Sequence, residues 1–70
     1  MNIYALNLRL DQKKCSYKDL AELLGISRSS LYRKLSGQTD FTCTEIAGIR
    51  QHLALTDTAL IEIFFHNNPV

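Results

Sequence analysis

The sequence predicts an all-α domain of five short helices. Turn signals separate apolar-periodic segments of about ten residues, and Pro69, near the end, is the only proline. The chain has 70 residues and is 46% hydrophobic, which suits one domain close to the smallest size that folds around a single core. Because so small a core is only marginally stable, self-association would add stability, and dimerisation is plausible from size alone.

The first segment, residues 2–14, is compatible with a helix or with a strand. Ile3, Leu6 and Leu10 have helical spacing, but Leu8 joins the two leucines in an alternation typical of a strand. We expect a helix, because a single strand among helices has no pairing partner. A strand paired across a dimer is the alternative.

A pair of helices joined by a glycine turn follows. Ser16 can cap the first, at about residues 17–24, and Gly25 can end it in a left-handed conformation. Ser27 can cap the second, at residues 28–36, before another glycine. This order predicts two crossed helices with a sharp turn between them.

Two further helices are predicted in the second half. Thr42 and Glu45 have capping-box spacing, and the helix they open should reach His52 or Leu53. Thr56 can cap a fifth helix at about residues 57–65. The fold is expected to end at Asn67, Asn68 and Pro69.

The outward face of the helix at residues 28–36 carries basic and hydroxyl side chains and no acidic one, while Leu31 and Leu35 mark its buried stripe. Arginine can make two hydrogen bonds to guanine in the major groove, and serine or tyrosine can reach bases or phosphates. The pattern predicts base contacts from Arg28, Ser29, Tyr32 and Arg33. Contacts to the DNA backbone are expected from Tyr17, Lys18, Ser27, Lys34, Ser36, Gln38 and Thr39.

The charge distribution fits an oriented anionic partner better than the total charge does. The net charge is only +1. Residues 1–36 contain seven basic and three acidic residues, a net +4, and the remainder contains one basic and four acidic residues, a net −3. An ordinary solvated surface is the alternative interpretation.

The stretch from Asp19 to Ser27, DLAELLGIS, and the stretch from Leu31 to Gly37, LYRKLSG, resemble the helix-turn-helix of phage-repressor-like regulators of the Cro/C1 or XRE type. The resemblance extends over roughly residues 6–65. It implies a compact five-helix, lambda-repressor-like domain that binds operator DNA as a homodimer. We therefore expect a sequence-specific transcriptional regulator, a phage, prophage or mobile-element repressor. An adaptor or antirepressor that uses the same fold without reading DNA is the alternative.

The last helix is apolar on more than one face, so some of its apolar area should remain after the core is filled. We expect this surplus to form a homodimer interface that includes Ile63, Phe64 and Phe65. The alternative is a small core wrapped by a terminal helix.

No metal, cofactor or catalytic site is predicted. The residues Cys15, Cys43, His52 and His66 lack the short ligand spacing that zinc sites favour. No cluster of residues indicates a cysteine–histidine catalytic pair. Two cysteines are too few for a secreted disulfide framework, and no export or membrane segment is evident. We expect reduced thiols, a cytoplasmic location and no enzymatic activity.

Overall fold

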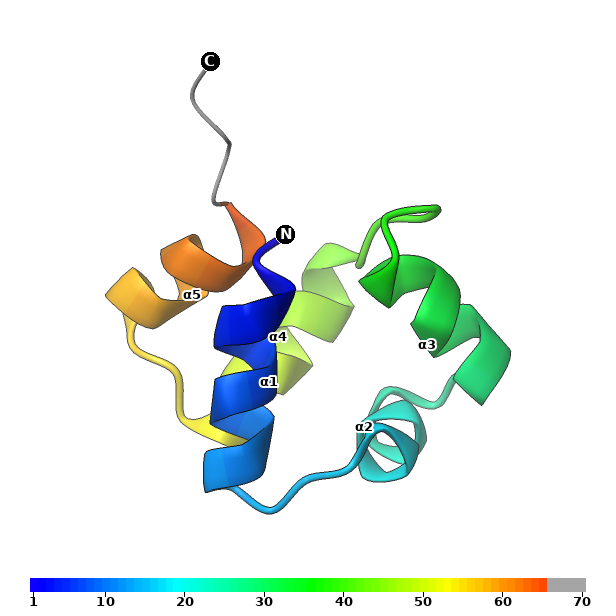
Figure 1. The fold of residues 1–70 in the computed structure, drawn as a ribbon, viewed down its shortest axis with the longest axis horizontal. Coiled ribbons are helices and arrows are strands. Elements are labelled where there is room, and N and C mark those ends of the chain that lie inside the picture. Colours follow the sequence, from blue (N-terminus) through cyan, green and yellow to red (C-terminus); the bar gives the residue numbers. More distant parts are fainter. Residues whose placement is uncertain (66–70) are drawn as a thin grey trace.

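The computed structural model describes residues 1–65, which form five α-helices and no strand (Figure 1). The first segment is therefore a helix, as expected, and the strand alternative is wrong. His66 and the expected chain end at Asn67, Asn68 and Pro69 lie outside the described residues. The helices are α1 (Ile3–Gln12), α2 (Tyr17–Leu24), α3 (Arg28–Leu35), α4 (Cys43–Leu53) and α5 (Asp57–Phe64).

Every helix begins after a side chain that caps it. In each case the capping oxygen accepts a hydrogen bond from the backbone N–H three residues later, at 3.0–3.1 Å. A cap of this kind stabilises a helix by about 1 kcal/mol, which matters in a small domain. The capping residues are Asn2, Ser16, Ser27, Thr42 and Thr56.

Two of the helices are followed by a glycine with left-handed backbone. Gly25 follows α2 with φ +68°, and Gly37 follows α3 with φ +87°. Glycine enters this region without strain because it has no Cβ. The end of α4 departs from that rule, because Ala54 adopts φ +52° there.

Each helix contributes one fully buried side chain to the core, and each of these five side chains is 0% exposed. In Figure 1, α4 lies between α3 and α5, which stand at opposite ends of the molecule. The first helix packs against α5, where the Asn2 backbone N–H donates to the Ile63 carbonyl at 2.7 Å, and α2 packs against both α3 and α4. The five core residues are Leu6, Leu20, Leu31, Ile49 and Ile63.

Helix α5 places its apolar residues differently from the expectation. Ile63 is fully buried, so its side chain is covered by its own chain and is not available to a partner. Phe64 is half-buried, with its ring edge against Phe41 at a centroid distance of 5.7 Å. The exposed apolar residues of this region are Ile61 and Phe65, each 56% exposed. None of the described helices is long and apolar enough to cross a membrane.

Candidate nucleic-acid interface

The turn between α2 and α3 holds the two helices in tight contact. Helix α2 packs against α3, and Ala21 of α2 is 2% exposed, so a larger side chain at this position would crowd the core. After Gly25, the backbone N–H of Ile26 donates to the Ala21 carbonyl at 3.1 Å, which closes the turn against α2. Leu31 then anchors α3 in the core, so this helix has a fixed outward face.

That outward face carries all four residues expected to contact bases. Arg28, Ser29, Tyr32 and Arg33 are exposed, on a helix that contains no acidic residue. Ser29, Tyr32 and Arg33 lie one, four and five positions after Arg28, so the four residues form one continuous strip. The structure therefore presents two guanidinium groups, a phenol and a hydroxyl on one exposed helix face.

Ser30 belongs to this surface in a way that sequence reasoning missed. Its hydroxyl oxygen accepts from the Ser27 hydroxyl at 3.0 Å and from Nη2 of Arg33 at 3.2 Å. A guanidinium has five N–H donors, so Arg33 keeps others for a ligand. Ser27, Ser30 and Arg33 are spaced three residues apart, so they are neighbours on the helix surface. This spacing could have indicated their contact from the sequence alone.

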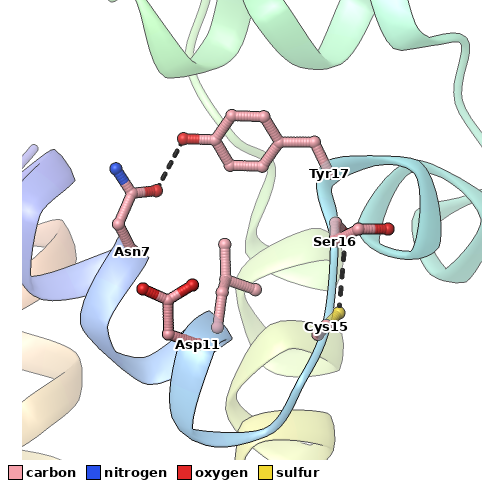
Figure 2. A pocket seen from close by; sticks show the side chains of 6 residues that line it. Asn7, Asp11, Cys15, Ser16 and Tyr17 are labelled. Atoms are coloured by element: carbon pink, nitrogen blue, oxygen red, sulfur yellow. Dashed lines mark hydrogen bonds between the residues drawn. The ribbon is translucent and has the colours of Figure 1, made fainter.

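Tyr17 is engaged within the chain, in contrast to its expected contact with the DNA backbone. Its hydroxyl donates to Oδ1 of Asn7 at 2.6 Å, as Figure 2 shows, and its ring lies edge-on to Tyr32 with centroids 5.9 Å apart. Phosphate oxygens only accept hydrogen bonds, so Tyr17 would have to release Asn7 to donate to one. The same close-up shows the pocket beside this hydrogen bond. The pocket has a volume of about 340 Å³ and is lined by Asn7, Leu10, Asp11, Cys15, Ser16 and Tyr17.

Lys34 also points to its own chain. Its ammonium lies 3.0 Å from Glu45 and donates to the Asp40 carbonyl at 3.0 Å, and only 13% of its side chain is exposed. The physical reason is its position three residues after Leu31, which turns it toward α4 and not outward. Lys34 thus joins α3 to α4, and the expected role at the DNA backbone does not fit this geometry.

The other residues expected at the DNA backbone are exposed. The Ser27 hydroxyl caps α3, and the Ser36 hydroxyl donates to the Arg33 carbonyl at 3.1 Å, so both have partners in the chain. The same carbonyl accepts from the backbone N–H groups of Gln38 and Thr39, which fixes the loop after α3. Lys18 lies on α2, and Gln38 and Thr39 lie in the loop after α3.

Asp19, in the first turn of α2, carries a carboxylate that is held by the N-terminus of that helix. Hydrogen bonds from the Ser16 backbone N–H and with its hydroxyl lower the pKa of Asp19, and the charge of Lys18 adds to the effect. The negative charge is therefore retained at neutral pH, where it complements the helix dipole.

The cysteines lie in different environments. Cys15 is 8% exposed within the core, and burial, with the nearby Asp19 charge, raises the pKa of its thiol. Cys43 is exposed at the start of α4. Within residues 1–65, no three histidine, cysteine, aspartate or glutamate side chains group closely enough to hold a metal ion. His66 lies outside that range.

Comparison with protein families gives a match that covers most of the chain. The model of the Cro/C1-type helix-turn-helix DNA-binding domain covers residues 5–63, from α1 through α5. Comparisons with curated proteins and with solved structures gave no significant match. The family match spans most of the chain and agrees with the five-helix fold, the glycine turn and the exposed face of α3. The chain therefore belongs to the Cro/C1-type helix-turn-helix DNA-binding domains.

Proposed function

We propose that this protein is a sequence-specific transcriptional regulator, a repressor of the phage, prophage or mobile-element kind, whose helix α3 enters the DNA major groove. The observation that carries the proposal is the outward face of α3. Arg28, Tyr32 and Arg33 are exposed there without a carboxylate among them, while Leu31 on the opposite side is fully buried. A helix held firmly by its inner face can present such residues to base edges.

The proposed contacts fall into two groups. Arg28 and Arg33, with Ser29 and Tyr32, would read bases, because arginine pairs with guanine and the smaller polar groups reach neighbouring edges. Phosphate contacts are assigned to exposed residues outside the strip, which would orient the helix without specifying sequence. These are Lys18, Gln38 and Thr39, together with Ser27 and Ser36. The two serine hydroxyls would turn from their acceptors in the chain to donate to phosphate.

We further propose that the protein acts as a homodimer in the cytoplasm, without catalytic activity. Ile61 and Phe65 are each 56% exposed at the α5 end, and Phe64 lies beside them half-buried. Because α5 and α3 stand at opposite ends of the molecule, a contact through α5 would leave both copies of α3 uncovered (Figure 1). Two such copies would address half-sites about one helical turn apart.

Selection of bound duplexes from a random DNA pool tests the proposal. We expect an enriched sequence with two related halves, bound with an affinity that falls steeply as salt rises. Arg33→Ala should relax the preference at one base position, and sedimentation should show a dimer that Phe65→Glu disrupts. Absent binding, or binding insensitive to salt, would favour the adaptor role and contradict DNA reading.

A further inference from the structure

We infer that Tyr17 is a positioning residue for DNA reading, which holds the ring of Tyr32 on α3 and is itself held by Asn7 on α1. The inference rests on the proposed function, because the placement of Tyr32 matters only if α3 reads DNA. It goes further in giving α1 a part in specificity, although α1 carries none of the assigned DNA contacts.

The first contact joins α1 to α2. Tyr17 is the first residue of α2, and its hydroxyl donates to Oδ1 of Asn7 at 2.6 Å across ten residues of sequence. Asn7 lies between Leu6 and Leu10 in sequence, whose side chains are 0% and 2% exposed. Since those leucines fix α1 on the core, the acceptor has a fixed position, and the hydrogen bond sets the orientation of the half-buried Tyr17 ring.

The second contact joins α2 to α3. The Tyr17 and Tyr32 rings lie 5.9 Å apart with an interplanar angle of 77°, which is the edge-to-face arrangement that aromatic rings favour. An exposed tyrosine on a helix otherwise samples several staggered rotamers. The contact with the Tyr17 ring restricts that choice, while 47% of Tyr32 stays accessible.

A restrained Tyr32 should affect binding to the selected DNA site and binding to random DNA differently. Ordering a side chain before binding reduces the entropy lost on association. This gain is realised where Tyr32 meets base edges and not where lysine meets phosphate. The effect of Tyr17 should therefore appear in the ratio of affinities for selected and random DNA, with the salt dependence unchanged.

The test uses the full chain and measures this ratio for variants of both tyrosines. Tyr17→Leu should lower it by roughly threefold to tenfold, the range expected for losing one aromatic pair. Tyr17→Phe keeps the ring and should lower it less, as should Asn7→Ala. Matched controls are Tyr4→Leu and Tyr4→Phe, since Tyr4 on α1 is 84% exposed and belongs to neither contact. Their ratio should stay as in the wild type.

A double variant separates positioning from a general loss of structure. In a Tyr32→Leu background, Tyr17→Leu should change the ratio little, because the residue that it positions is gone. An undiminished effect there, or an equal loss on selected and random DNA, would overturn the inference and leave the proposed function standing. Should Tyr17→Leu fail to fold, Tyr17→Phe and Asn7→Ala decide by the same ratio. A wild-type protein without preference for any duplex would overturn both.

Discussion

The ammonium of Lys34 lies 3.0 Å from the carboxylate of Glu45, and only 13% and 14% of the two side chains are exposed. The same carboxylate accepts from the backbone N–H of Thr42 at 2.8 Å, which completes the capping box of α4. The ammonium also donates to the Asp40 carbonyl. One ion pair therefore connects the end of α3, the loop and the first turn of α4.

Replacing Lys34 should destabilise the fold more than replacing an exposed partner of an ion pair. We expect Lys34→Met to lower the free energy of unfolding by about 1–3 kcal/mol, because a shielded carboxylate loses its charged hydrogen-bond donor. The matched control is Arg50→Met, since Arg50 pairs with Asp57 at side chains that are 46% and 78% exposed. That exposed pair should contribute about 0–1 kcal/mol. Urea unfolding measures both, and equal losses would contradict the prediction.

The Glu45 contacts also predict how stability depends on pH. Burial raises the pKa of Glu45, but the Thr42 N–H and the Lys34 ammonium together lower it by more, so the net pKa lies below its ordinary value. A carboxyl whose pKa is lower in the folded state stabilises the fold above its unfolded pKa, about 4.3 for glutamate. This contribution is lost as the pH falls through the folded pKa.

Urea midpoints at pH 3, 4, 5 and 7 check that dependence. The wild-type midpoint should be nearly constant at the two higher values and fall at the two lower ones. Glu45→Gln should lower the midpoint at pH 7 and flatten the fall, whereas Glu62→Gln, at an exposed position of α5, should behave as the wild type. A fall equally steep in Glu45→Gln would show that other carboxyls govern it.

The sequence predicted the four later helices well because the start of each has a local chemical cause. Ser16, Ser27 and Thr42 each supply a capping oxygen at the start of a helix, and Gly25 supplies the left-handed turn. These signals depend on neighbours within four residues, so no knowledge of the tertiary fold was needed. The exposed strip of α3 follows from the same periodicity, once Leu31 is assigned to the core.

Partners between helices could not be predicted in the same way. Periodicity places Lys34 and Tyr17 on a helix face but does not say which residue of another helix lies opposite. Both have long side chains that can reach solvent or a neighbour, and only the packing of α1 and α4 decides between these. On α5 the apolar residues cover more than one face, so the pattern alone did not distinguish buried Ile63 from exposed Ile61.

Gly48 in the middle of α4 should be replaceable by alanine with a gain in stability. A Cβ built there would lie 3.8 Å from Cδ2 of Leu24, an ordinary van der Waals contact. Gly48→Ala should therefore stabilise the protein by about 0.5–1 kcal/mol, the helix-propensity difference. Gly25→Ala is the opposite case, because φ is +68° there and alanine is strained. A loss of stability in both variants would show that α4 tolerates no added atom.

At Ala54 the opposite substitution, alanine to glycine, should stabilise the protein. It ends α4 with φ +52° and ψ +48°, a left-handed conformation in which its Cβ costs roughly 1 kcal/mol. Ala54→Gly should raise the thermal midpoint, while Ala47→Gly, an exposed site within α4, should lower it. Equal losses would mean that chain entropy outweighs the relief of strain.

The sharpest test of the α3 surface compares an arginine on the strip with an exposed lysine on α2. Arg33 is exposed, with Ser30 accepting one of its N–H groups at 3.2 Å, so its guanidinium is oriented before DNA arrives. Arg33→Ala should weaken binding to the selected site by about 1–3 kcal/mol and relax the preference at one base position. Lys18→Ala should weaken all duplexes alike and reduce the salt slope by about 1.

Affinities for the selected site, for its single-base variants and for random DNA at several salt concentrations separate these effects. Ser30→Ala should reproduce part of the Arg33→Ala change, because it removes only the support of the guanidinium. If Arg33→Ala and Lys18→Ala lowered every affinity by the same factor, both residues would be contacting phosphate. The exposed strip of α3 would then bind DNA without reading its sequence.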